Sequence, residues 1–414
     1  MAADTFLTHD MLAERTLFDL ENELAFSKNV YRGYNSEVEE TVKGFKKGGT
    51  VRVQLPNKYR TKSGATMDAV GIQERNVTIT VDEHRHVAVD ILESDLTLNI
   101  ADLSKKILRP ASIALANYVD AQGCKEYKNV YNQVGTPGTT PSTFSVLADA
   151  ALRLDQEGIV REGRVCVFSP KAHWAMADGE LKTVFQQKIV DTMLRKGFIG
   201  NFALFDMYMD PNIQTHTVGA HGGTPVMNGA TAEAATALVT DGWSASAAVL
   251  KQGDIFTVAA VYGVNPVSGD VWEGNELRQF VCTADETSVS DALSIAIAPT
   301  IYSSAASEDV LPYQTIGTLP ANEGAITVVG TASSAYPVNL AFHPHAFALT
   351  CVPFRRPMSA GESVMWGQAS DKQLGLSITV STGFDVSSYL ENSRMDILFG
   401  WDTPQPEYAV RIAG

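Results

Sequence analysis

Ala101 to Asn132 reads ADLSKKILRPASIALANYVDAQGCKEYKNVYN, and this stretch carries the longest helical pattern in the chain. Asp102 precedes the pattern as a possible N-cap. Pro110 interrupts it, so we predict a kink near Lys106 or two helices in series. A helix of about 30 residues is about 45 Å long at ~1.5 Å per residue, which is the length of a scaffold element. One face of this helix holds apolar and small residues at steps of three and four: Leu103, Ile107, Ala111, Ala114, Tyr118 and Ala121.

Composition and charge exclude several classes of protein. The 414 residues are 45% hydrophobic and 19% charged, with a net charge of −15. No run of basic residues alternates with aromatic ones, so contact with nucleic acid is expected to be non-specific. The N-terminus lacks a signal-peptide pattern and no stretch of about 18 apolar residues occurs, which predicts a soluble protein made in the cytosol without membrane contact. Four scattered cysteines without CxxC spacing argue against a zinc site or a disulfide framework: Cys124, Cys166, Cys282 and Cys351.

The first 75 residues contain two elements suited to contacts with other molecules. Residues 9–28 predict an amphipathic helix with an apolar stripe, which packs either on a neighbouring subunit or on the chain's own core. A strand pattern at 51–55 then leads into the polar, basic stretch Asn57 to Gly64. Residues 45–75 predict a long loop or extended hairpin; loops of this length are usually functional or interaction elements, and an unordered surface loop is the alternative.

The rest of the chain reads as α/β structure on both sides of a β-rich segment. Strand patterns at 77–81 and 87–91 around a turn predict a hairpin. Helices are expected at 142–158, from Pro170, and at 180–196, with strands at 165–167, 202–209, 374–380 and 394–401. Residues 212–340 are rich in Thr, Ser, Gly, Ala and Val, with strands at 254–262, 276–282 and 325–329 and a possible helix at 290–298. Such a segment between two α/β parts predicts an inserted all-β domain.

Recognisable catalytic chemistry is absent from the sequence. We find no GxGxxG before a helix, no GxxxxGK[ST], no GxSxG and no HExxH. Two HxH pairs, His84 with His86 and His343 with His345, lack further ligands nearby. We therefore predict no catalytic, cofactor-binding or metal-binding residues and no enzymatic activity.

In the order of its parts the chain resembles the major capsid (coat) proteins of tailed bacteriophages with the Hong Kong 97 type fold. It is most similar to the coat proteins of Salmonella-type short-tailed phages, which carry an inserted domain. The resemblance spans nearly the whole chain and is carried by these segments: residues 49–56, 77–91, 107–117, 251–254, 339–343 and 346–349.

The resemblance implies an α+β fold and its domains. It implies an N-terminal arm at 1–44, an extended loop at 45–75, a peripheral domain at 76–169 with a spine helix at about 101–132, an axial domain at 170–211 and 341–414 that includes the C-terminal strands, and an inserted β barrel-like domain at 212–340. A bend at Pro110 would let the spine follow shell curvature. Some relatives form a Lys–Asn isopeptide bond in the extended loop, but the branch with an inserted domain generally does not, and we do not predict one.

The resemblance also implies a function in the virion capsid, assembled in the host cytoplasm. Pentamers and hexamers of the chain would close an icosahedral shell around the double-stranded DNA genome of a tailed bacteriophage (Caudoviricetes). Expected partners are copies of the chain, a scaffolding protein, a portal protein and the packaged DNA, contacted non-specifically. Two sets of candidate interface residues follow: Lys58, Arg60 and Lys62 toward a neighbouring subunit, and Asp10, Glu14 and Asp19 toward a basic scaffolding protein. A decoration or tail protein and a soluble β-rich hydrolase are the alternatives.

Overall fold

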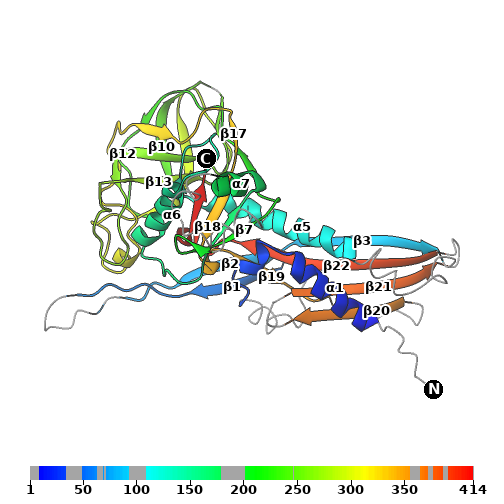
Figure 1. Cartoon of the computed structure of the whole chain (residues 1–414). Helices are drawn as coiled ribbons and strands as arrows, with labels where there is room; N and C mark the ends of the chain where they lie inside the picture. Colours follow the sequence, from blue (N-terminus) through cyan, green and yellow to red (C-terminus); the bar gives the residue numbers. More distant parts are fainter. Residues whose placement is uncertain are drawn as a thin grey trace, which may run out of the picture. The chain divides into compact units, whose positions relative to one another are not determined.

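The computed structural model describes residues 9–33, 49–62, 69, 71–92, 109–178, 201–245, 247–354, 364–371, 376–385 and 390–413. The chain forms two compact units (Figure 1). The first unit holds residues 1–53, 76–123 and 347–402, and the second holds residues 54–75, 124–346 and 403–414. Each unit is therefore built from segments that lie far apart in the sequence.

A five-stranded antiparallel sheet forms the body of the first unit. Its longest strand, β22 (Leu390–Asp402), pairs with β21 (Leu376–Asp385), with β3 (Glu83–Leu92) and with β19 (Ala348–Cys351). The strand β20 (Val364–Asp371) completes the sheet by pairing with β21. The strands expected at 374–380 and 394–401 are confirmed as parts of β21 and β22.

The hairpin expected between residues 77 and 91 is wrong, although both of its strands exist. β2 (Arg75–Val81) pairs with β1 (Gly49–Leu55), whereas β3 pairs with β22. Only Asp82 separates β2 from β3, and common hairpin loops need two residues or more. Alternating apolar residues thus predict the two strands correctly but do not reveal partners that are remote in sequence.

The helix α1 (His9–Glu23) lies along β20 and β21 of the same unit (Figure 1). Its predicted apolar stripe is buried there, with Ala13 and Leu20 fully covered. The stripe therefore packs on the chain's own core, which is one of the two alternatives that the pattern left open. Phe18, on a different face, is 56% exposed.

The turn that follows α1 is held by one carboxylate of α5 (Arg109–Lys125). Asp120 accepts hydrogen bonds from the backbone N–H groups of Ala25, at 2.8 Å, and Ser27, at 2.9 Å, and from the Ser27 hydroxyl. Burial raises the pKa of Asp120, and the hydrogen bonds from Ser27 and the backbone act in the opposite direction. The 3-10 helix η1 (Ser27–Asn29) is thereby tied to α5 within the first unit.

The helix α5 confirms part of the helix predicted at 101–132. It is followed directly by the 3-10 helix η3 (Glu126–Asn129), so helical structure continues over 109–129. Pro110 is in the first turn of the described helix, where a proline removes no intrahelical hydrogen bond. The kink expected near Lys106 falls on residues 101–108, which lie outside the described residues, and it stays a prediction.

A glycine near the end of α5 allows a close helix contact. A Cβ atom at Gly123 would lie 2.5 Å from Cζ2 of Trp401 and 2.9 Å from Cδ1 of Phe26. Such distances are shorter than any comfortable carbon–carbon contact, so the two rings occupy the space that a side chain would need. All three residues belong to the first unit.

The second unit contains a mixed sheet covered by two helices. The strand order is β4-β23-β18-β5-β7-β6, with β5–β7 and β4–β23 parallel and the other pairs antiparallel. The helices share one apolar core with the sheet. These elements are β4 (Gln133–Val134), α6 (Phe144–Gln156), β5 (Arg164–Phe168), α7 (Pro170–Asp178), β6 (Asn201–Phe202), β7 (Phe205–Met209), β18 (Asn339–Phe342) and β23 (Ala409–Ile412).

Two local predictions in this part need correction. The pattern places Phe144, Leu147, Ala148, Ala151 and Leu152 on the buried face of α6. The structure instead buries Leu147, Ala150 and Leu154 and exposes Phe144 and Leu152, because the sequence carries two overlapping apolar stripes and the sheet selects one of them.

The second correction concerns residues 202–209, which were expected to form one buried strand. They form β6 and β7, which pair antiparallel across a tight turn. Ala203 and Leu204 make that turn with φ angles of 49° and 69°, in the left-handed region. The helix expected at 180–196 lies outside the described residues.

The β-rich segment forms its own six-stranded antiparallel sheet in the order β16-β12-β13-β15-β10-β9. Its apolar side chains form a separate core cluster. The strands are β9 (Gly223–Met227), β10 (Ala235–Trp243), β12 (Ile255–Tyr262), β13 (Leu277–Cys282), β15 (Leu293–Ile301) and β16 (Ile326–Val328). Two further strand pairs are β8 (Thr215–Thr217) with β17 (Ala335–Pro337) and β11 (Ala248–Leu250) with β14 (Glu286–Thr287). The segment also contains the 3-10 helix η4 (Leu311–Tyr313), and two more 3-10 helices follow it, η5 (Pro344–Ala346) and η6 (Pro406–Tyr408).

The strands predicted at 254–262, 276–282 and 325–329 are confirmed as β12, β13 and β16. The helix considered at 290–298 is wrong, because β15 runs through these residues. Leu293, Ile295 and Ile297 are buried at every second position, which is the period of a strand.

Candidate functional site

The three predicted basic interface residues lie against other parts of the second unit. Lys58 Nζ is 3.2 Å from Glu407 Oε1, and Lys62 Nζ is 3.0 Å from Glu308 Oε2. Arg60 lies between them in sequence, and its contacts are equally intramolecular. The structure thus gives each of these cations a contact within its own chain, and contact with a neighbouring subunit stays a prediction.

Arg60 is positioned by backbone and amide groups. Its Nε donates to the carbonyl of Pro266 at 3.1 Å, and its Nη1 donates to Gln314 Oε1 at 3.0 Å. Burial lowers the pKa of Arg60, and the nearby charge of Asp270 partly offsets this. Gly269, beside the guanidinium, has a φ angle of 83°, in the left-handed region that favours glycine.

Glu407 is the acidic partner that sequence reasoning missed. Its carboxylate also lies 3.4 Å from Nη1 of Arg75, so two cations share one acid. Burial raises the pKa of Glu407, but Lys58 and Arg75 together outweigh burial and hold it below its usual value. No spacing rule could have found this cluster, because Glu407 is separated from Lys58 by 349 positions.

A cleft of about 440 Å³ lies beside this cluster in the second unit. Its wall includes the ion pair Arg278–Glu157, with Nη1 2.6 Å from Oε1, as well as the Glu407 cluster. Burial lowers the pKa of Arg278, but Glu157 and Tyr131 outweigh it and the pKa is raised. The charges that line the cleft are therefore mostly paired with one another rather than directed at a charged ligand.

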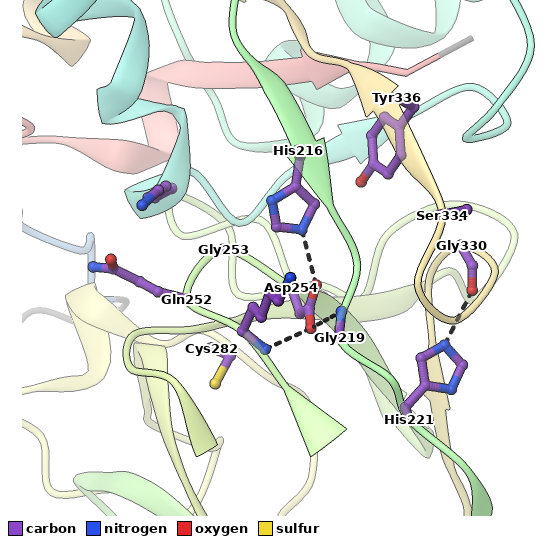
Figure 2. A network of polar contacts seen from close by, with 12 residues as sticks. His216, Gly219, His221, Gln252, Gly253, Asp254, Cys282, Gly330, Ser334 and Tyr336 are labelled. Atoms are coloured by element: carbon purple, nitrogen blue, oxygen red, sulfur yellow. Dashed lines mark hydrogen bonds and ion pairs between the residues drawn. The ribbon is translucent and has the colours of Figure 1, made fainter. Parts of the chain in front are cut away.

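A buried polar network joins the strands that lead into and out of the β-rich segment (Figure 2). His216 on β8 stands opposite Tyr336 on β17 in the strand register. Its Nε2 is 2.8 Å from Asp254 Oδ1, and its Nδ1 is 3.0 Å from the Tyr127 hydroxyl. Burial raises the pKa of Tyr127 to about 12, so this hydroxyl is protonated at neutral pH. Each polar atom of the imidazole thus has a partner.

Asp254 is the acceptor at the centre of this network (Figure 2). Its Oδ2 accepts from the backbone N–H of Gly219 at 3.0 Å and of Lys251 at 2.8 Å. Arg411 lies close by and donates to the carbonyl of Gly253 at 2.6 Å. Burial lowers the pKa of Arg411 to about 10. These hydrogen bonds tie β8, the residues before β12 and β23 to one another within the second unit, and leaving any of these buried polar groups unpaired would be costly.

The acids predicted to meet a scaffolding protein lie on α1. Glu14 is exposed, and Asp19 lies 3.8 Å from Nε of Arg15 on the adjacent helical turn. Asp10 falls in the first turn of the helix. Asp10 and Glu14 are four residues apart and lie on one side of α1, whereas Asp19, nine residues after Asp10, lies on the opposite side. Contact of these acids with a partner stays a prediction.

The described residues include two close contacts of histidine side chains. No group of three His, Cys, Asp or Glu side chains able to hold a metal is found in the described part of the chain. His343 and His345 stack at 5.2 Å, and burial lowers the pKa of His343 to about 4. His84 lies on β3 and its Nε2 is 2.8 Å from Asp396 Oδ1. None of the described helices is long and apolar enough to cross a membrane.

These contacts hold segments that are remote in sequence to one another. The chain belongs to the family described as "P22 coat protein - gene protein 5", whose model matches residues 1–414. It is accordingly a major capsid protein, the subunit of a bacteriophage shell.

Solved structures with a similar course of the chain come from phages and a virus-like particle. A structure from Mycobacterium phage Che8 has a TM-score of 0.47 at 13% identity, covering 94% of this chain and 90% of that one. The capsid of cyanophage P-SCSP1u has a TM-score of 0.39 at 11% identity, covering 89% and 84%. A virus-like particle from Pyrococcus furiosus has a TM-score of 0.36 at 8% identity, covering 97% of each chain. No curated protein sequence matches the chain.

Proposed function

We propose that copies of this coat protein form pentamers and hexamers that close an icosahedral shell around the double-stranded DNA of a tailed bacteriophage. Membership of the coat protein family over residues 1–414 carries this proposal. Closed rings of identical subunits are the usual route to such assemblies. Assembly takes place in the host cytoplasm with a scaffolding protein and a portal protein, and the subunit has no catalytic role. The net charge of −15 suits a wall that encloses DNA without binding it tightly.

The subunit has the Hong Kong 97 type fold with the arm, extended loop, peripheral, axial and inserted domains at the boundaries given above. Support for an inserted domain at 212–340 comes from its separate apolar core and from the β8–β17 pair, which brings residues 215 and 337 together. Support for an extended loop at 45–75 comes from the pairing of β1 with β2 at its two ends.

Sedimentation tests shell assembly. The purified full-length chain, mixed with the scaffolding protein of the same phage, is expected to shift from a slow monomer peak to a fast particle peak. A chain that stays in the slow peak over a range of salt and protein concentrations, with native circular dichroism, would count against the proposal.

The acids of α1 bind the basic scaffolding protein in this proposal. Replacement of Asp10, Glu14 and Asp19 by Asn, Gln and Asn should weaken scaffold binding, and the loss should be smaller at high salt because screening reduces the native attraction. Asp241→Asn, in the β-rich segment, is the control. Binding by the native chain that does not change with salt would argue against an electrostatic contact.

A further inference from the structure

The extended segment 54–75 has an outgoing leg, residues 54–62, and a returning leg, residues 71–75, within the described residues. One tyrosine hydroxyl touches both legs. The backbone N–H of Lys58 donates to the Tyr313 hydroxyl at 3.2 Å, and this hydroxyl donates to the backbone carbonyl of Gln73 at 3.2 Å. Tyr313 belongs to η4 of the β-rich segment. The two legs are therefore joined through a residue that lies 240 positions or more beyond them.

The carboxylate of Glu407 also contacts both legs, in this case through their side chains. Glu407 binds Lys58 from the outgoing leg and Arg75 from the returning leg. The Arg75 guanidinium also lies 5.5 Å from the centre of the Tyr313 ring. The Glu407 side chain is 9% exposed, whereas Lys58 and Arg75 are 31% and 32% exposed, so the carboxylate is buried and both cations remain partly solvated.

Charge favours this position of the segment. Residues 54–75 contain four basic and two acidic side chains, whereas residues 212–340 contain twelve acidic and two basic ones. A basic segment beside an acidic one gains attraction over several contacts at once. The contact of Lys62 with Glu308 belongs to the same pattern, but it contributes little because the Glu308 side chain is 64% exposed.

We propose that Tyr313 and Glu407 form a clasp that fixes the base of the extended segment to the second unit before the subunit meets a neighbour. β1 and β2 are anchored by Val53, Ile79 and Val81, which are buried in a core cluster. The legs beyond these strands, residues 56–62 and 71–74, form no strand and depend on the contacts of Tyr313 and Glu407. The clasp orders both legs in the free subunit, so that binding to a neighbouring subunit costs less conformational entropy. This inference rests on the proposed function only in that the segment reaches a neighbouring subunit.

Hydrogen exchange on the full-length monomer tests the clasp directly. Tyr313→Phe keeps the ring beside Arg75 and removes both hydrogen bonds. The Lys58 amide should then exchange about three- to tenfold faster, as expected for losing one ordinary hydrogen bond. The control is Tyr302→Phe, in the same cleft, because the Tyr302 hydroxyl makes no hydrogen bond to the described residues of either leg. Equal exchange of Lys58 in Tyr313→Phe and in the native monomer would overturn the clasp.

Assembly kinetics give the second readout. Tyr313→Phe and Glu407→Gln should raise the protein concentration needed for shells at least threefold, while the monomer keeps its native circular dichroism. If the native chain assembles and both variants assemble at the same concentration, the clasp has no role in assembly and the inference is wrong. If the native chain forms no shells at all, the proposed function fails, and the exchange result alone decides whether the clasp exists.

Discussion

Replacing Asp254 by Asn tests whether the buried network holds the β-rich segment in place. The substitution changes neither the size nor the shape of the side chain, so packing is conserved. Asp254 is 1% exposed and accepts from His216, Gly219 and Lys251. The single side-chain oxygen of Asn can accept the hydrogen bonds from the backbone N–H groups of Gly219 and Lys251. The side-chain NH2 group then faces Nε2 of His216. A change of tautomer lets His216 accept from this amide and donate to Tyr127.

The expected cost follows from this geometry. Every hydrogen bond can be kept, but all three lose the assistance of the negative charge. Hydrogen bonds to charged groups contribute ~1.5–3 kcal/mol and neutral ones ~0.5–1.5 kcal/mol. The loss is then about 1–1.5 kcal/mol per bond, or about 3–4.5 kcal/mol for three bonds. A neutral amide costs less to bury than a carboxylate, which offsets part of this loss. We therefore expect Asp254→Asn to lower the free energy of unfolding by about 2–3 kcal/mol.

Urea unfolding of the full-length monomer, followed by tryptophan fluorescence, measures this loss as a shift of the midpoint at constant slope. Asp285→Asn is the matched control, because Asp285 accepts one hydrogen bond from the backbone of Gln252 at an exposed position. The control should change stability by less than about 0.5 kcal/mol, as is usual for surface substitutions. A loss for Asp254→Asn as small as that of the control would refute the view of Asp254 as a charged centre of the network.

Two further predictions concern packing and pH. Gly123→Ala should destabilise the monomer by about 1–3 kcal/mol, because the new methyl group overlaps Trp401; Gly71→Ala, with open space around it, is the control, and equal melting temperatures of the two variants would contradict the contact. The pKa of Glu407 is lowered in the folded chain, so its ion pairs stabilise the fold above the ordinary Glu pKa of about 4.3 and are lost as the pH falls through the lowered folded value. The stability difference between the native chain and Glu407→Gln should therefore shrink from pH 7 to pH 3; a difference that grows toward pH 3 would show that the sign is wrong.

Local periodicity predicted most elements but not their partners. The strands at 77–81, 254–262 and 394–401 follow from the spacing of apolar residues, as does the helix predicted at 9–28, which ends at Glu23 in the structure. The helix at 170–178 follows from Pro170, because proline favours the first position of a helix. The pairing of β3 with β22 does not, because it joins segments about 300 residues apart. Helix and strand also remain ambiguous in short apolar runs, as residues 290–298 show: their alternation favours a strand, while their alanines favour a helix.

The sequence indicated the basic residues of the candidate site but not the residues that bind them. Lys58, Arg60 and Lys62 form an evident basic stretch, and the length of the segment around them indicates a contact element. Tyr313 and Glu407 carry no such mark, since a lone tyrosine and a lone glutamate far along the chain are ordinary residues. Their role follows from the fold, which brings both next to the two legs of the segment.

The most direct test of the account is electron cryomicroscopy of particles formed by the full-length chain with the scaffolding protein of the same phage. The account predicts closed icosahedral shells in which each pentamer and hexamer position is filled by one copy of this fold, with residues 54–62 and 71–75 beside Tyr313 and Glu407 of the same chain. Preparations that contain only monomers or open tubes under all assembly conditions would contradict the proposed shell.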